Sequence, residues 1–172
     1  FEGGYNEFTS AQSSQNGEGR VVSTEDLGLN FNGRYYITED ITLRAAVEYL
    51  DKESQTTGYA DLETLTVPVA VYYDFDEALS AGIGYRNRTS KVGSQVTSAK
   101  ADSDDHAFFV GVENQVSEIW GYELEIGFQQ RDFDSNEFSD EDGVFASILA
   151  NWQISEMTEL VGQLSNEFGT TL

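Results

Sequence analysis

The sequence contains no cysteine, one histidine, one proline and only nine Lys and Arg residues among its 172 positions. Without cysteine the chain can form neither a disulfide framework nor a Cys-ligated zinc site, and thiol catalysis is excluded. A single histidine, His106, cannot build a multi-histidine metal centre. The 31 acidic residues exceed the basic ones by 31 − 9 = 22. This negative charge would repel a polyanion, so we expect no nucleic-acid partner.

Long hydrophobic runs are also missing. Apolar residues never continue for more than four or five positions, which is too short for a transmembrane helix. The chain is nevertheless 39% hydrophobic and 13% aromatic, which is enough to support a folded structure. Its length suits one domain, and we assign residues 1–172 to a single unit.

Four short segments repeat one pattern: an apolar residue, then Thr, Ser or Asp, then Glu. They are Ile37-Thr38-Glu39, Phe75-Asp76-Glu77, Val116-Ser117-Glu118 and Ile154-Ser155-Glu156. Their glutamates lie 38, 41 and 38 residues apart, so one supersecondary unit is used repeatedly. On both sides of each glutamate, apolar residues occupy every second position, which indicates strands with one apolar face. Each unit therefore predicts two strands of about 10–13 residues joined by a tight turn.

Polar segments separate these units. Residues 9–24, 51–61, 89–105 and 132–142 are rich in Ser, Thr, Asn, Gln, Gly and acid, and we predict long loops there. Short turns at one end and long loops at the other give an all-β, antiparallel, up-and-down meander. Residues 25–169 hold eight predicted strands, and Phe1–Phe8 can supply a ninth. The last segment, 154–168, also fits a helical spacing, but the register of the repeat favours a strand.

Two architectures fit such a meander. One is a soluble β-sandwich or lipocalin-like barrel with the apolar face inward, which would bind a ligand or a glycan. The other is a transmembrane β-barrel with the apolar face toward lipid. Soluble strands usually have about 5–6 residues, whereas membrane-spanning strands need about 9–11. The predicted strands have the longer value, so we favour the transmembrane barrel.

The polar side chains of these strands occupy the positions between the apolar residues, and therefore lie on the opposite face of each strand. Five of the nine basic residues lie on it, all of them arginines, and they are accompanied by glutamates. Arg and Glu can pair across a barrel interior, whereas a soluble protein would spread lysine over an exposed sheet face. We predict that the lumen is lined by Arg34, Arg44, Glu48, Arg86, Arg88, Glu123, Glu125 and Arg131.

Aromatic residues lie on the apolar parity at both ends of the strands. Near the short turns they are Tyr35, Tyr73, Phe75, Trp120, Tyr122 and Trp152, and near the long loops they are Tyr49, Tyr85, Phe108 and Phe128. Two aromatic girdles separated by aliphatic residues are what a bilayer with two interfaces requires. We therefore expect the face that carries Leu43 to contact lipid and the face that carries Arg44 and Glu48 to point into the lumen.

The hairpin repeat with its two girdles resembles the Gram-negative outer-membrane β-barrel proteins over residues 25–169. Within that class, three segments are similar to porin-type barrels encoded with exopolysaccharide genes: Gln130-Arg131-Asp132-Phe133-Asp134, Ala150-Asn151-Trp152 and Asn166-Glu167-Phe168-Gly169-Thr170-Thr171. The resemblance implies the outer membrane, periplasmic short turns, external loops, and contacts with lipid and lipopolysaccharide. It further implies a structural or porin-like role, with polysaccharide or small solutes as candidate cargo. Complete barrels of this kind have an even number of strands and periplasmic ends, so we expect a fragment of a larger barrel or a chain trimmed at both ends.

Two features could carry chemistry of another kind. His106 is the one candidate general base, and some outer-membrane lipid enzymes are similar in using a histidine near a strand end with a serine. No serine here lies in a recognisable nucleophile motif, so a solvated loop histidine is the simpler interpretation. The segment Asp132-Phe133-Asp134-Ser135-Asn136 begins a calcium-loop pattern that fails at Glu137 and Gly143. This leaves at most a weak Ca²⁺ site at Asp132, Asp134 and Asp140. We expect no cofactor and no catalysis.

Overall fold

The computed structural model describes residues 2–13, 19–54, 60–93 and 102–167, with the backbone alone described for 2–13 and 19–24. Nine strands are present in these ranges. They are β1 (Glu2–Ser13), β2 (Gly19–Tyr36), β3 (Ile41–Ser54), β4 (Asp61–Asp74), β5 (Leu79–Gly93), β6 (Ser103–Ser117), β7 (Trp120–Phe133), β8 (Glu141–Ser155) and β9 (Thr158–Asn166). No helix in the described part of the chain is long and apolar enough to cross a membrane.

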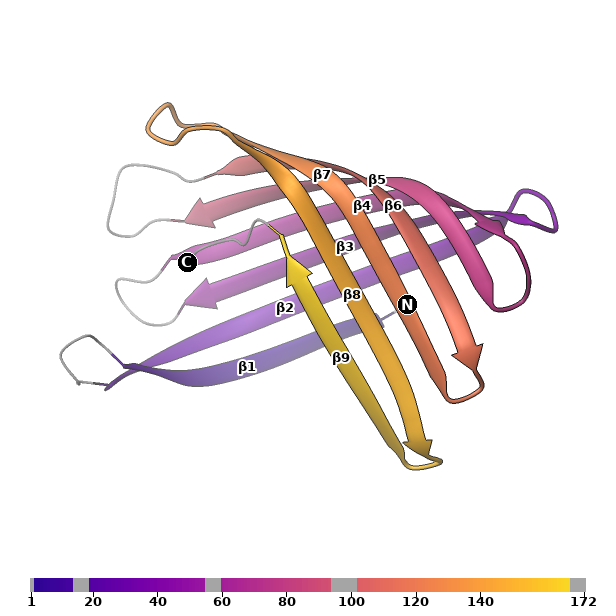
Figure 1. Ribbon diagram of the computed structural model, residues 1–172. Helices are drawn as coiled ribbons and strands as arrows, with labels where there is room; N and C mark the ends of the chain where they lie inside the picture. The colour runs from indigo at the N-terminus through magenta and orange to yellow at the C-terminus, as the bar shows by residue number, and fades with distance from the viewer. Residues whose placement is uncertain (1, 14–18, 55–59, 94–101, 168–172) are drawn as a thin grey trace.

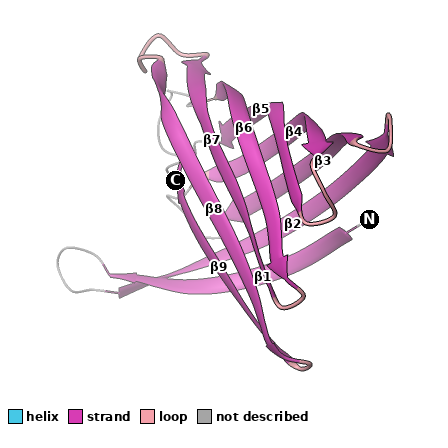
Figure 2. Ribbon diagram, turned by 45° about the vertical axis from the view of Figure 1, so that its right-hand side comes forward, coloured by secondary structure: helices cyan, strands magenta, loops and turns pink. Residues whose placement is uncertain are grey.

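All nine strands form one sheet in chain order, and every neighbouring pair is antiparallel. The sheet curls into a half-barrel, with β2 and β3 on one wall and β8 and β9 on the other (Figures 1 and 2). The prediction of an all-β, antiparallel, up-and-down architecture is therefore confirmed. The segment at the end of the chain is also a strand, β9, as the repeat register favours over the helical spacing.

Short turns join the two strands of each repeat unit. Residues 37–40 and 75–78 form four-residue connections, and residues 118–119 and 156–157 form two-residue connections. The carboxylate of Asp76 accepts hydrogen bonds from the backbone N–H groups of Ala78 and Leu79, both at 2.8 Å. This side-chain cap replaces backbone partners that the tight turn cannot supply. The repeated glutamates, Glu39 and Glu77 among them, lie in these turns because the chain reverses where the apolar alternation stops.

The strands extend further toward the long loops than the alternation predicts. The predicted loop 9–24 is wrong for most of its length, because β1 runs to Ser13 and β2 begins at Gly19. The loops predicted at 51–61, 89–105 and 132–142 likewise lose residues to the strands from β3 to β8. Strand pairing uses backbone N–H and C=O groups and continues where both faces are polar. Such stretches carry no apolar alternation, so the sequence pattern ends before the strands do.

The register of the sheet sorts side chains into rows that run across the strands. One apolar row on the convex face crosses six strands and consists of Leu43, Val71, Ile83, Val110, Ile126 and Ala146. Ile83 is 68% exposed and Val110 is 56% exposed, so this row faces away from the trough. The next row toward the loops is aromatic at Tyr85, Phe108 and Phe128. The row beyond it is polar and contains Asn87, His106, Gln130 and Asp142.

Candidate functional site: the concave face

In the middle of the concave face, aromatic side chains pack against glycines at the paired positions of the adjacent strands. The row next to the apolar one, with the opposite parity, consists of Arg44, Ala70, Gly84, Phe109, Gly127 and Phe145. Phe145 is fully buried and Phe109 is 7% exposed. A Cβ at Gly84 would overlap the Phe109 ring, and a Cβ at Gly127 would lie 2.6 Å from the Phe145 ring. The glycines therefore leave the space that these rings occupy inside the curled sheet.

Arg44 connects two walls of the trough. Its guanidinium forms an ion pair with Glu113 of β6, although β4 and β5 lie between their strands. The guanidinium carbon also lies 4.0 Å from the ring centre of Tyr72. The Tyr72 ring, which is 5% exposed, covers Gly82 and Gly111. Such a contact between strands that are not neighbours is possible only across the concave face, which places Arg44 and Glu113 in the interior.

Arg86 makes a second contact of this kind. Its Nη2 lies 3.2 Å from a carboxylate oxygen of Glu167, and its Nη1 lies 3.8 Å from one of Glu125. The guanidinium carbon is 5.2 Å from the centre of the Phe145 ring. One arginine of β5 thus contacts β7, β8 and the residue that follows β9.

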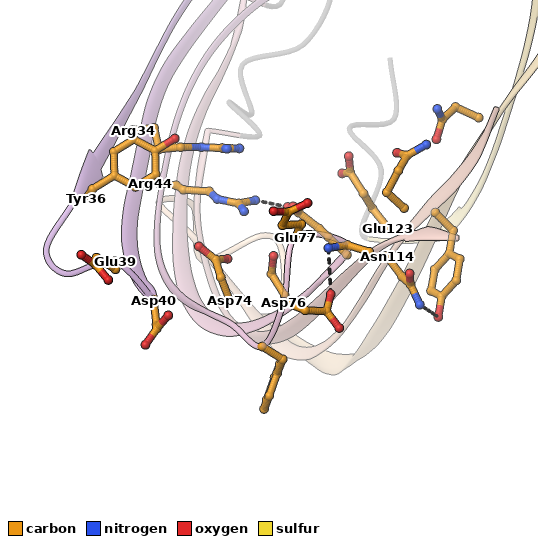
Figure 3. A pocket seen from close by; sticks show the side chains of 17 residues that line it. Arg34, Tyr36, Glu39, Asp40, Arg44, Asp74, Asp76, Glu77, Asn114 and Glu123 are labelled. Carbon is orange, nitrogen blue, oxygen red and sulfur yellow. Dashed lines mark hydrogen bonds and ion pairs between the residues drawn. The ribbon is translucent and has the colours of Figure 1, made fainter. Parts of the chain in front are cut away.

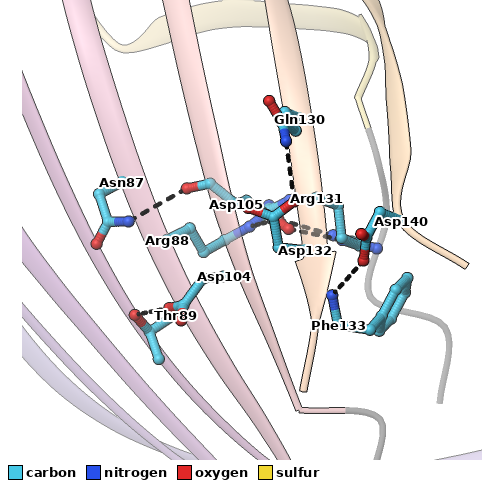
Figure 4. A network of polar contacts seen from close by, with 10 residues as sticks. All are labelled: Asn87, Arg88, Thr89, Asp104, Asp105, Gln130, Arg131, Asp132, Phe133 and Asp140. Atoms are coloured by element: carbon cyan, nitrogen blue, oxygen red, sulfur yellow. Dashed lines mark hydrogen bonds and ion pairs between the residues drawn. The ribbon is translucent and has the colours of Figure 1, made fainter. Parts of the chain in front are cut away.

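Nearer the long loops, two arginines share one buried carboxylate (Figure 4). Arg88 donates from Nε to Asp105 at 2.8 Å, and Arg131 donates from Nε and Nη2 at 2.6 and 2.7 Å. Asp105 and Arg131 are both buried. The three residues lie on β5, β6 and β7 in one row, so this network clamps three neighbouring strands on their concave side.

The remaining predicted lumen residues lie free of such networks. Arg34, Glu48 and Glu123 are exposed, and within the described residues no ion pair is recorded for them. All three border open polar space on the concave side. One cavity of about 530 Å³ lies at the short-turn end, where Arg34, Arg44 and Glu123 meet acids of the turns (Figure 3). A second cavity of about 520 Å³ includes Arg34, Arg44, Glu48, Glu123 and Glu125.

The aromatic residues of the predicted girdles lie mainly on the convex side. Tyr35 is 69% exposed, and Tyr73, Trp120, Trp152 and Phe128 are also exposed. Tyr49, Tyr85 and Tyr122 are partly buried by neighbours. Ring pairs connect several of them: Tyr73 with Phe75 at 4.9 Å, Tyr85 with Phe108 at 4.9 Å and Trp120 with Tyr122 at 5.6 Å between ring centres. Tyr122 and Phe75 differ from the rest because they also border the cavity at the short-turn end.

His106 lies on the convex face in the polar row just beyond the aromatic one. Its Nδ1 is 2.6 Å from the hydroxyl of Tyr85 and 3.4 Å from the side-chain nitrogen of Asn87. The two rings of Tyr85 and His106 also stack, with centres 6.1 Å apart. None of the hydrogen bonds that the described residues give His106 involves a serine. His106 is thus part of strand β6 and not of a loop, which corrects the sequence-based interpretation.

Carboxylates at the end of β7 and in the acidic loop that follows it make local hydrogen bonds. Asp132 accepts from Gln130 at 2.9 Å, and Asp140 accepts from the backbone N–H of Phe133 at 3.1 Å. The backbone N–H of Asp134 donates to the carbonyl of Asp102 at 3.0 Å. Across the described ranges, no group of three or more His, Asp or Glu side chains is arranged to hold a metal ion. The calcium hypothesis therefore gains no support from this geometry.

Several concave-face residues were not found from the sequence. Glu113 and Asp105 have the polar parity of β6, so the alternation of Phe108, Val110 and Val112 could have found them. Tyr72, Phe109 and Phe145 could not be found in this way, because they are aromatic residues at strand positions where the alternation predicts a polar side chain. A glycine at the paired position of the adjacent strand is the one sequence signal for such a ring, and it requires the register.

Comparisons with known proteins find similarity to a solved structure but to no family model. No family model and no curated protein sequence matches the chain. The chain is similar to the crystal structure of the Pseudomonas putida toluene transporter TodX, with a TM-score of 0.46 and 12% sequence identity. The match covers 95% of this chain and 64% of that chain, so this chain spans less than two thirds of the transporter's length. The segment Phe168-Gly169-Thr170-Thr171, used above for the resemblance to exopolysaccharide-associated barrels, lies outside the described residues.

Proposed function

We propose that this chain forms part or all of an outer-membrane β-barrel with a structural or porin-like role and no catalytic function. The observation that carries the proposal is the separation of the two sheet faces. The convex face presents rows of exposed aliphatic and aromatic side chains, while the concave face holds ion-paired Arg, Asp and Glu. A barrel in lipid needs this arrangement, because charged side chains are costly against hydrocarbon and tolerated in the lumen.

The height of the apolar band supports a membrane location. Along β7, the outward residues from Trp120 to Phe128 are aromatic at both ends and aliphatic between. Eight residue steps at about 3.3 Å each give about 26 Å along the strand. At the usual tilt of about 40° this is about 20 Å along the membrane normal, near the apolar band of about 25 Å in outer-membrane barrels. The polar row that contains His106 begins immediately beyond it.

The soluble alternative needs the apolar rows to form a closed core. In the described sheet those rows lie on the outside of the curve, and Ile83 and Val110 are mostly exposed. The concave side offers a small cluster of buried apolar residues, Ala70, Tyr72, Ala107, Phe109 and Phe145, surrounded by charges. The geometry therefore favours lipid on the convex face.

The concave face suggests the kind of cargo. Its two polar cavities contain both arginines and carboxylates, a lining that suits small polar solutes. We propose small solutes as cargo, with polysaccharide as the alternative that the resemblance implies. Outer-membrane lipid and lipopolysaccharide would surround the convex face, with the short turns in the periplasm and the acidic loops outside.

Tryptophan quenching tests the membrane placement. The chain has two tryptophans, and Trp120 pairs with Trp152 across β7 and β8 on the convex face at the short-turn end. We expect lipids brominated near the headgroup to quench their fluorescence more strongly than lipids brominated at the chain end. The unboiled protein should also migrate differently from the boiled protein on an SDS gel. A compact monomer that stays in solution without detergent and shows no quenching would contradict the proposal. Planar-bilayer conductance then tests the porin-like role.

A further inference from the structure

Arg86 occupies an unusual position on the concave face. Its strand, β5, is in the centre of the sheet, yet its guanidinium reaches Glu167, the residue directly after β9 at the edge. In the antiparallel order of the sheet, β6, β7 and β8 lie between these two positions. A contact over that separation must cross the hollow of the half-barrel and cannot follow the wall.

The contacts around Arg86 hold its side chain in this crossing position. Glu125 lies at 3.8 Å on one side, and the Phe145 ring lies under the guanidinium at 5.2 Å. Phe145 is itself fixed, because it is fully buried and packs where Gly127 leaves room. Because the ring and the carboxylates already restrict the Arg86 guanidinium, holding it in this one conformation costs little further side-chain entropy.

Glu167 is held by the end of β9. The preceding residue, Asn166, pairs with Ala146 in the sheet and also accepts a hydrogen bond from the backbone N–H of Ala146 at 2.6 Å. The strand is therefore anchored to β8 up to Asn166, and the chain leaves the sheet at the next residue. Glu167 then lies on the concave side, partly buried, with its carboxylate 3.2 Å from Nη2 of Arg86.

We infer that the bridge from Arg86 to Glu167 is the constriction of the interior and that Arg86 is its specificity-determining residue. This inference rests on the proposed porin-like function. In a closed barrel, a solute that enters from the short-turn cavity, which Arg44 and Glu113 border, would pass this bridge on its way to the cluster of Arg88, Asp105 and Arg131 near the loops. The bridge brings one cation and two carboxylates to the same point, so it restricts both the size and the charge of what passes.

Cross-linking tests the placement independently of transport. The chain has no cysteine, so introduced thiols are unique. We expect the double variant Arg86→Cys with Glu167→Cys to be joined by a short bis-maleimide in the folded, full-length protein. The matched control is Asn87→Cys with Glu167→Cys, because Asn87 is adjacent in sequence but faces the convex side. Equal cross-linking of both pairs would overturn the inference.

Conductance in planar bilayers tests the role. Arg86→Gln and Glu167→Gln should each raise single-channel conductance by roughly two-fold or more and change ion selectivity. The double variant should show no further increase, because both changes release the same bridge. Glu159→Gln, on the same face but outside the bridge and outside both cavities, should leave conductance near that of the unaltered protein. A conducting protein whose conductance the Arg86 and Glu167 variants leave unchanged overturns this inference alone. Absence of conductance from the unaltered protein and from every variant overturns the porin-like function itself.

Discussion

Arg44 of β3 forms an ion pair with Glu113 of β6 while its guanidinium lies 4.0 Å from the ring centre of Tyr72 on β4. One side chain thereby connects three strands across the hollow of the half-barrel. Side chains that are neighbours neither in sequence nor in strand order thus meet because the sheet curls.

A double-mutant cycle should measure this connection. For Arg44→Ala and Glu113→Ala we expect a coupling of about 1 kcal/mol or more in the free energy of unfolding, because both side chains are largely shielded from water. The control is Lys91 with Glu63, which is solvent-exposed and 3.7 Å apart. That pair should couple by less than about 0.5 kcal/mol. Urea unfolding of the protein in detergent or vesicles supplies the four free energies of each cycle. Equal coupling in the two cycles would mean that the Arg44 contact does not hold the sheet.

Asp105 should be essential for the cluster near the loops. Asp105→Asn removes the carboxylate charge that both Arg88 and Arg131 contact, in a cluster that is largely shielded from water. We expect a loss of about 3–5 kcal/mol in the free energy of unfolding. Asp132→Asn is the matched control, since Asp132 is near the surface and its partner Gln130 can still donate to an amide oxygen. That change should stay within about 0.5 kcal/mol. Similar losses for both variants would contradict the structural role given to Asp105.

Gly127 should tolerate no side chain. A Cβ there would meet the carbonyl oxygen of Phe108, the ring of Phe145 and the Cβ of Phe109, so Gly127→Ala forces the concave core apart. The expected loss is about 1–3 kcal/mol. At Gly162 on β9 a Cβ would meet nothing within 4 Å, and Gly162→Ala should have almost no effect. The temperature at which the unboiled band shifts on an SDS gel compares the two variants. A shift of the same size in both would show that the aromatic rings do not depend on this glycine.

An introduced arginine should impair folding in membranes on the convex face of β5 but not on its concave face. Ile83→Arg places a charge in the centre of the apolar row, where it costs about 2–4 kcal/mol at the bilayer midplane. Ser80→Arg, three residues earlier, places the same charge beside the acidic cavity at the short-turn end. We expect the first variant to lower the folded fraction in membranes and the second to leave it nearly unchanged. The folded fraction is read from unboiled samples on a gel. A lower folded fraction for Ser80→Arg than for Ile83→Arg would mean that lipid contacts the concave face and not the convex one.

Much of the architecture could be predicted from the sequence alone. The period of two places every strand from β2 to β9, and the repeated glutamates mark the short turns, because hydrophobic alternation and turn chemistry are local properties. Even the ambiguous segment that becomes β9 follows from the repeat. The same alternation separates the parity of Arg44, Arg86 and Arg131 from that of Ile83, so the division of the sheet into two kinds of face needs no coordinates.

The partners of these side chains needed the tertiary structure. The contacts of Arg44 with Glu113 and of Arg86 with Glu167 depend on the curl of the sheet, and curl is a property of the whole assembly of strands. The positions of Tyr72, Phe109 and Phe145 inside the trough depend on glycines of adjacent strands, which only the register brings opposite them. The ends of the strands near the loops could not be predicted from the sequence either, because backbone pairing continues there without any hydrophobic pattern. Local periodicity therefore determined the faces of the sheet, while long-range register and curvature decided which charges meet inside it.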